Sequence, residues 1–113
     1  MHELGLTRNI VDTIQEVVRK NNVQEVVKVV LEIGQISGVM PEAIEFCFFV
    51  CAKGTVLEKA HLEIRRVAAL GQCKVCEKEF DLLKGNFSCP SCGDSVWDLI
   101  SGKELNIKEL EVI

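Results

Sequence analysis

Two CxxC pairs constrain this chain more than any other feature of its sequence. Cys73-Lys-Val-Cys76 and Cys89-Pro-Ser-Cys92 are separated by twelve residues. Each pair can curl into a knuckle that directs both sulfurs at one centre, and a hairpin through residues 84–86 would bring the two knuckles together. Four thiolates at about 2.3 Å satisfy a tetrahedral Zn²⁺ ion and leave no coordination position open for a substrate. The spacing therefore predicts a structural zinc site on these four cysteines.

Composition and charge exclude several classes of protein. The chain has 113 residues, enough for one domain that carries a small module. Its net charge of -4 argues against tight binding to nucleic acid or to anionic lipid. No apolar run reaches the about 18 residues of a membrane helix, and the start MHELGLTRN lacks the features of a signal peptide. We therefore expect a cytoplasmic protein.

Other uses of the cysteines fit this sequence less well. A reducing cytoplasm disfavours a disulfide framework, and a thioredoxin-type redox enzyme would show one CxxC beside a βαβ pattern. An iron centre has the same ligands and stays open. A module this short buries little apolar surface, so metal binding would supply much of its folding free energy, about 10 kcal/mol or more in comparable peptides. Phe80, Phe87 and Trp97 are expected to form its small core.

Hydrophobic periodicity predicts an α+β domain around the cysteine module. Segments with apolar residues at helical spacing alternate with Val-rich or strictly alternating segments that are typical of strands. The predicted elements are a helix over about residues 6–21, a strand over 25–33, a helix over 41–53, a strand over 62–69 and a C-terminal strand from 105. We expect a small sheet of about three strands packed with two helices, built from residues 1–69 and 102–113. A zinc-ribbon-like domain over residues 70–101 is inserted into it.

Local signals add detail to these elements. Pro41 suits the first turn of the second helix and Gly54 suits its end. The apolar phase of the last strand slips between Ile107 and Leu110, which indicates a bulge. The MHEL segment is expected to pair with the same sheet as an additional short strand. The second helix should bury the stripe Ile44, Cys47, Phe48 and Cys51, while Phe46, Phe49 and Val50 leave an excess apolar surface that indicates a partner.

The first residues, Met1-His2-Glu3, offer a different kind of metal site. The terminal amine, the His2 backbone nitrogen and His2 Nδ1 can close adjacent chelate rings in one plane, which suits nitrogen-bound Ni²⁺ or Cu²⁺. The Glu3 amide or a side chain from elsewhere would be the fourth donor. A frayed terminus with a solvated histidine is the ordinary alternative. Because the donors must lose their protons to bind, the affinity is expected to fall as the pH drops.

The remaining candidate residues receive structural roles. Cys47 and Cys51 are spaced to clamp a metal, but we expect them to be small buried hydrophobes. His61 is expected at the solvated surface, although a dimeric form could recruit it as a ligand, which leaves a homodimer open. No nucleophilic triad, phosphate-binding glycine loop or spaced acid pair appears, so we do not expect an enzyme.

These residues together resemble the HypA family of nickel metallochaperones. The resemblance covers essentially the whole chain through MHELGLTRNIVDTI, VLEIGQISGV, EAIEFCFFVCAKGT and the paired CxxC motifs. It implies a nickel-binding α+β domain joined to a structural zinc domain. The implied nickel site is Met1 through its amine, His2 and Glu3, and the implied zinc site is Cys73, Cys76, Cys89 and Cys92.

The same resemblance implies a non-enzyme that works beside a HypB-type GTPase and delivers Ni²⁺ to the precursor of the hydrogenase large subunit. Some family members also assist urease maturation. One departure concerns a carboxylate that certain relatives place after the loop over residues 34–39, where this chain has Met40 and Pro41, and for which Glu42 or Glu45 could substitute. The residues alone also permit a zinc-ribbon adaptor that binds RNA or a protein complex, with an inert amino terminus.

Overall fold

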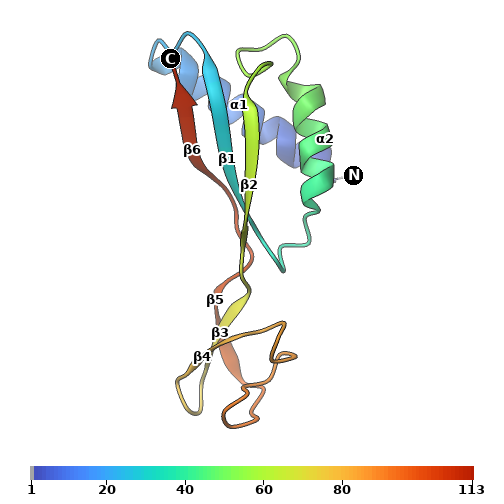
Figure 1. Ribbon diagram of the computed structural model, residues 1–113, viewed down its shortest axis with the longest axis vertical. Helices are drawn as coiled ribbons and strands as arrows, with labels where there is room; N and C mark the ends of the chain where they lie inside the picture. Colours follow the sequence, from blue (N-terminus) through green and yellow to red (C-terminus); the bar gives the residue numbers. More distant parts are fainter. Residues whose placement is uncertain (1) are drawn as a thin grey trace. The chain divides into compact units, whose positions relative to one another are not determined.

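The computed structural model describes residues 2–113, and Met1 lies outside the described residues. Figure 1 shows the elements in chain order as α1 (His2–Lys20), β1 (Val26–Gly34), α2 (Pro41–Ala52), β2 (His61–Val67), β3 (Leu70–Cys73), β4 (Glu79–Asp81), β5 (Trp97–Ser101) and β6 (Leu105–Val112). The strands form two three-stranded sheets, in the orders β2-β1-β6 and β4-β3-β5. The predicted fold, two helices with one sheet plus a separate cysteine-bearing sheet, is confirmed.

The chain divides into two compact units. The first contains the chain up to Glu32, Val39–Arg65 and Asn106–Ile113, and the second contains Ile33–Gly38 and Arg66–Leu105. No helix in the described part of the chain combines the length and the apolar character that crossing a membrane requires.

The β2-β1-β6 sheet is mixed. β2 follows β1 through the crossover helix α2 and runs parallel to it, as a βαβ connection requires. β6 runs antiparallel to β1, because Ile113 N–H donates to the Glu25 carbonyl near one end (2.9 Å) and Gly34 N–H donates to the Glu104 carbonyl at the other (2.8 Å). A Val-rich segment suits β1 because this strand lies between β2 and β6 and most of its residues are buried.

The core of the first unit lies where α1 and α2 pack against each other and against the sheet. Helical spacing places the buried residues of each helix on one face. The buried residues include Val11, Ile14 and Val18 of α1, Val29 and Leu31 of β1, Ile44, Cys47, Phe48 and Ala52 of α2, and Leu57. Pro41 opens α2, and Gly54 follows its end with φ +76°, as the sequence indicates.

The structure corrects the prediction for the first residues. The MHEL segment was expected to pair with the sheet, but α1 already begins at His2. Glu3 stabilises the first turn because a carboxylate there opposes the positive end of the helix dipole. The buried Thr7 hydroxyl also donates to the Glu3 carbonyl at 2.7 Å, one helical turn back. His2 and Glu3, two of the predicted nickel ligands, therefore lie in the first turn of α1.

The apolar phase slip predicted for the last strand is visible in the burial of β6. Its half-buried residues are Leu105, Ile107 and Leu110, with exposed residues between them. The bulge inferred from this slip stays a prediction.

The second unit is built on the antiparallel β4-β3-β5 sheet. Cys73, the last residue of β3, lies opposite Trp97 of β5. The strand predicted over 62–69 ends earlier, at Val67, and β3 begins at Leu70 as a separate strand. Ile36 N–H donates to the Gly102 carbonyl at 2.9 Å, which ties the segment after β1 to the segment after β5.

Gly34 and Gly102 provide a stability test within this unit. A Cβ at Gly34 would lie 1.9 Å from the Gly102 carbonyl oxygen and 2.6 Å from the Lys103 nitrogen, both backbone atoms that cannot rotate away. We expect Gly34→Ala to destabilise the protein by about 2 kcal/mol or more. The control is Gly5→Ala, because Gly5 is an exposed helical residue whose Cβ meets nothing within 4 Å. It should stabilise by about 0.5–1 kcal/mol. Urea unfolding followed by circular dichroism measures both changes, and equal effects would contradict the backbone clash.

Candidate metal centre

The two CxxC segments fold into a pair of matching knuckles. In the first, Cys73 N–H donates to the Lys78 carbonyl (2.9 Å) and Glu77 N–H donates back to the Cys73 carbonyl (2.9 Å). The second repeats this pattern sixteen residues later, with Cys89 N–H donating to Asp94 (2.8 Å) and Gly93 N–H donating to Cys89 (2.7 Å). Each knuckle therefore presents its two sulfurs from one tight turn.

The residue after the second cysteine of each knuckle adopts the left-handed backbone conformation. Gly93 has φ +79° and Glu77 has φ +64°. Glycine enters this region without steric cost, whereas a residue with a side chain does so at some expense. The Gln72 side-chain amide donates to the Glu77 carbonyl at 3.1 Å, which holds the costly turn in place.

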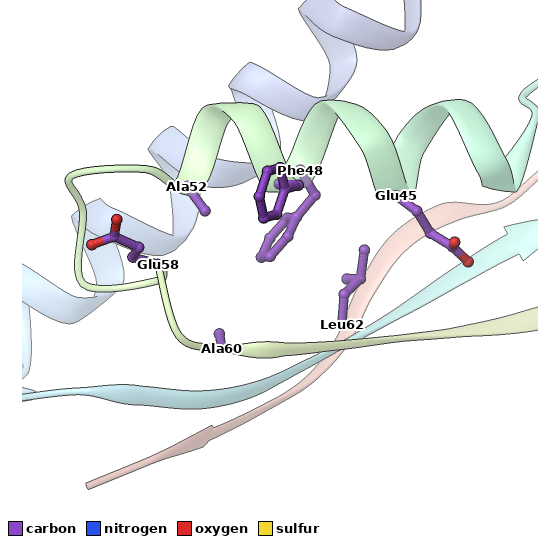
Figure 2. A pocket seen from close by; sticks show the side chains of 7 residues that line it. Glu45, Phe48, Ala52, Glu58, Ala60 and Leu62 are labelled. Carbon is purple, nitrogen blue, oxygen red and sulfur yellow. The ribbon is translucent and has the colours of Figure 1, made fainter.

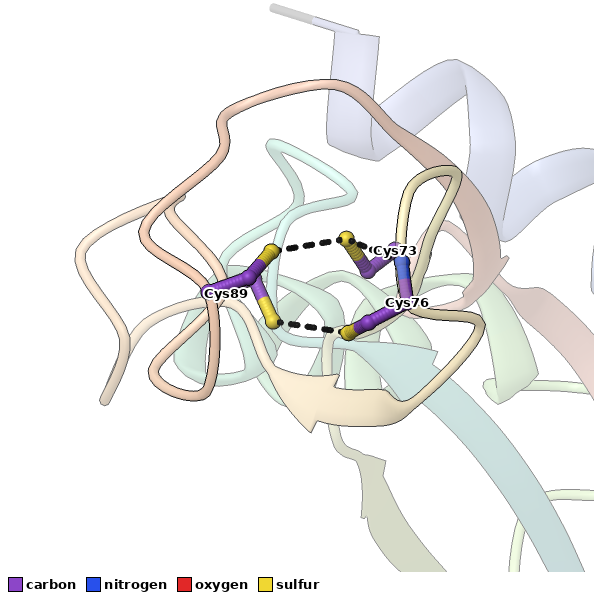
Figure 3. A group of neighbouring side chains, drawn as sticks. Cys73, Cys76 and Cys89 are labelled. Carbon is purple, nitrogen blue, oxygen red and sulfur yellow. Dashed lines mark hydrogen bonds between the residues drawn. The ribbon is translucent and has the colours of Figure 1, made fainter.

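The four sulfurs converge on one point, as Figure 3 shows for the facing side chains. The ligand atoms of Cys73, Cys76, Cys89 and Cys92 all lie within 4.8 Å of one another. The Cys73 and Cys92 sulfurs are 3.5 Å apart, and the Cys76 and Cys89 sulfurs are 3.6 Å apart. A regular tetrahedron with metal–sulfur bonds of about 2.3 Å has sulfurs about 3.8 Å apart, so the donor set fits an ion of zinc size.

Backbone amides distinguish the first cysteine of each knuckle from the second. The N–H groups of Cys76 and Val75 point at the Cys73 sulfur, 3.5 and 3.4 Å away, and they lower the pKa of Cys73. The N–H groups of Cys92 and Ser91 act likewise and lower the pKa of Cys89 to about 7. These hydrogen bonds therefore favour the thiolate form of both cysteines.

The second cysteine of each knuckle resists ionisation. One amide N–H, from Asp94, favours the Cys92 thiolate, but the neighbouring Cys73 sulfur and burial raise the pKa of Cys92 to about 12. For Cys76, the N–H of Lys78 is likewise outweighed by burial and by the Cys89 sulfur, so its pKa is raised. Four thiolates in this space repel one another, and a bound cation is what would compensate them.

A small apolar core supports the knuckles. It consists of Ala69, Cys73, Phe80, Leu82 and Cys89, with Ile36, Cys76 and Trp97 packed against it. The prediction for Phe87 is wrong, because this residue is 42% exposed. Its ring lies 6.3 Å from that of Trp97 at the surface, and its carbonyl accepts the Trp97 Nε1 hydrogen bond at 3.0 Å. Leu82, which sequence reasoning missed, is fully buried in its place, and its alternation with Phe80 was the available signal.

The amino-terminal candidates lie in the first turn of α1. The His2 side chain is exposed, and its Nε2 lies 3.4 Å from Glu3 Oε2. Glu3 itself is buried, unusually for a carboxylate. Met1, the third predicted nickel residue, lies outside the described residues.

The residues set aside from metal binding take the expected structural positions. Cys47 is buried and Cys51 half-buried on α2, and neither joins the four-cysteine group that the described residues form. His61 is exposed at the start of β2. Glu42 and Glu45 are exposed on α2.

Comparison with known proteins agrees with this architecture. The model of the family described as "Hydrogenase/urease nickel incorporation, metallochaperone, hypA" matches residues 1–112. The hydrogenase maturation factor HypA of Trichodesmium erythraeum is 49% identical over 112 residues, which span 99% of this chain and 96% of that protein.

Two solution structures have the same fold. One, of a HypA protein, gives a TM-score of 0.76 at 23% identity and covers 100% of this chain and 97% of that one. The other, of the Ni metallochaperone HypA from Helicobacter pylori, gives a TM-score of 0.71 at 21% identity and covers 98% of this chain and 97% of that one. Taken with the family match over nearly every residue, the chain belongs to the HypA family of nickel metallochaperones, which are non-enzymatic factors of hydrogenase maturation.

Proposed function

We propose that this protein binds Ni²⁺ at its amino terminus and delivers it to the hydrogenase large subunit precursor, beside a HypB-type GTPase. The observation that carries the proposal is the family match over residues 1–112 in a chain that begins Met-His-Glu. The same family description includes urease, so urease maturation is a second destination of the cargo. Six free thiols suit a reducing cytoplasm as the place of work.

The position of His2 in a helix supports its role as a nickel ligand. The first backbone N–H groups of a helix have no intrahelical acceptor. The His2 and Glu3 amide nitrogens can therefore become metal ligands without breaking a helical hydrogen bond. The exposed imidazole of His2 lies beside them, and the amine of Met1 completes the chelate in the proposal. Glu3 supplies its amide nitrogen, or its carboxylate, as a further donor.

The same position explains how the cargo could leave. The positive end of the helix dipole disfavours a cation at this turn, which limits affinity. An ion held by few and exposed donors can pass to a partner's thiolates by stepwise ligand exchange. We therefore propose a site tuned for transfer rather than for retention.

We further propose that Cys73, Cys76, Cys89 and Cys92 hold Zn²⁺ in a structural role. The convergence of their sulfurs and the opposed pKa shifts support this assignment. Bound zinc would supply the positive charge that lets all four thiols ionise together. The chain's own part is to hold the two knuckles face to face on the small apolar core.

A test of the nickel site compares the two histidines of the chain. We expect His2→Ala, and separately a one-residue extension before Met1, to abolish stoichiometric nickel uptake by zinc-loaded protein, because each removes a chelating nitrogen. His61→Ala is the control and should bind nickel normally, since His61 is exposed at the start of β2. Equilibrium dialysis with elemental analysis measures the uptake. Unchanged uptake in the His2 variants would instead favour the zinc-ribbon adaptor.

A test of the zinc site uses the single tryptophan as a local reporter. We expect Cys73→Ser to unfold the second unit, because loss of a ligand forfeits much of the about 10 kcal/mol or more that such sites supply. Trp97 fluorescence should then match that of unfolded protein, while circular dichroism keeps the signal of α1 and α2 in the first unit. Cys51→Ala is the matched control and should retain one zinc per chain. A folded, metal-free Cys73→Ser module would refute the structural role.

The four ligands should differ in reactivity. Cys92 is the one exposed member of the four-cysteine group, and one amide N–H, from Asp94, is aimed at its sulfur, whereas Cys89 accepts two. Fewer N–H donors leave more charge on a thiolate, so we expect iodoacetamide to modify Cys92 first in zinc-loaded protein. Peptide mass spectrometry gives the order, in a Cys51→Ala background that removes the half-buried thiol of α2. First modification of Cys73 or Cys89 would contradict this reasoning.

A further inference from the structure

An apolar groove runs along α2 on the side that faces the start of β2. It has a volume of about 310 Å³ and is lined mainly by Glu45, Phe48, Phe49 and Ala52 of α2 together with Glu58 and Leu62. The four α2 residues are spaced i, i+3, i+4 and i+7, so they form one continuous row on the helix. This volume is at the lower end of the range for small-molecule pockets, which begin at about 300 Å³, and it has room for one or two large side chains.

The rim of the groove exposes aromatic surface that the fold leaves uncovered. Phe49, which lines the groove, is 64% exposed, and Phe46 and Val50, which lie elsewhere on α2, are 69% and 44% exposed. Burial of an exposed aromatic ring is favourable, so exposed apolar side chains on the helix that lines a cavity are typical of an interaction surface.

Charge at the groove indicates what kind of side chain would approach it. Glu45 and Glu58 lie at opposite ends, with Phe48 between them (Figure 2). Among residues 2–113 neither carboxylate has an ion-pair partner, whereas Glu63 of β2 is paired with Lys28 at 3.0 Å and with Arg65 at 2.6 Å. The groove is therefore an apolar slot with a free negative charge at each end.

The Phe49 ring already attracts one cation. The Lys53 ammonium lies 4.9 Å from its centroid, within the range of a cation–π contact. Because the chain's own lysine takes this ring, the selection for positive charge in an occupant rests on Glu45 and Glu58.

We propose that this groove binds a segment of a partner protein in which one or two large apolar side chains are flanked on both sides by Lys or Arg. The proposal rests on the proposed function, because a carrier that exchanges its ion by ligand transfer must dock on the protein that receives it. Figure 2 places Glu58 at the Ala52 end of the groove, and Ala52 is two helical turns, or about 10 Å, from Glu45. The flanking basic residues should therefore be about seven residues apart in a helix or about three apart in a strand.

Other occupants agree less well with these charges. Phosphate-bearing partners would be repelled by Glu45 and Glu58 and by the net charge of -4. A second copy of this chain docked about a two-fold axis would place the same acidic rim against itself, which is unfavourable.

The test uses synthetic helical peptides as probes on the full zinc-loaded protein. The first peptide carries two Leu residues flanked by Lys, the second replaces each Lys by Glu, and the third keeps Lys but replaces Leu by Ser. We expect the first to bind most tightly by fluorescence anisotropy. Phe49→Ala should weaken it by about tenfold or more, because it removes one wall of the groove. The double variant Glu45→Lys with Glu58→Lys should reverse the preference in favour of the Glu-flanked peptide.

Matched variants keep the outcome specific. Leu83→Ala removes a side chain that is 47% exposed on the other unit, and Asp12→Lys with Glu79→Lys, at two exposed positions outside the groove, changes the net charge by the same amount as the groove variant. Both should bind the first peptide like the original chain. An equal loss in these controls, or no reversal in the groove variant, would overturn the proposal.

Two further measurements distinguish partner docking from self-association and from the proposed nickel binding. Sedimentation that shows self-association lost in Phe49→Ala would assign the groove to a second copy and overturn the proposal. Nickel uptake should be unchanged in every groove variant, because His2 is not part of the groove. Loss of peptide binding with normal nickel uptake supports docking at the groove. Failure of the original chain to bind nickel would contradict the proposed nickel-carrier function, and it would do so whatever the peptides show.

Discussion

Convergence of four sulfurs within 4.8 Å is the constraint on which the second unit depends. Three short strands and five buried residues form a core too small to hold two knuckles face to face unaided. Amide N–H groups favour ionisation of Cys73 and Cys89, while crowding opposes that of Cys76 and Cys92. This opposition favours a bound cation, and the proposed zinc ion would couple its own binding to the folding of the unit.

The nickel site proposed at the start of α1 lies under the opposite conditions. His2 lies at an exposed helix end, where the donors are few and the local dipole opposes a cation. The four cysteines are mostly enclosed and can offer four charges to one ion. Enclosure and charge favour retention, whereas exposure and few donors favour exchange. These different surroundings suit the proposed function, in which one ion is kept and another is given up.

Much of this could be predicted from sequence because the signals were local. CxxC spacing, Pro41 and Gly54 each act over one turn of chain, and the structure confirms the group and the helix that they indicate. The failures involve competition between local and tertiary effects. The MHEL segment was predicted to be a short strand, yet α1 begins at His2, where Thr7 and the helix dipole stabilise the first turn. Phe87 was predicted to lie in the core as an aromatic residue, but it is exposed and Leu82 is the buried residue.

The left-handed turn at Glu77 has a consequence for how such proteins are recognised. Its twin at Gly93 suggests a pattern in which glycine must follow the second cysteine. A search written with that requirement would find one half of this metal group and overlook the other. The hydrogen bond from the Gln72 side-chain amide to the Glu77 carbonyl stabilises the left-handed turn at Glu77, where the twin turn has a glycine. Two turns with the same backbone geometry can thus differ in sequence, because a residue outside both motifs stabilises one of them.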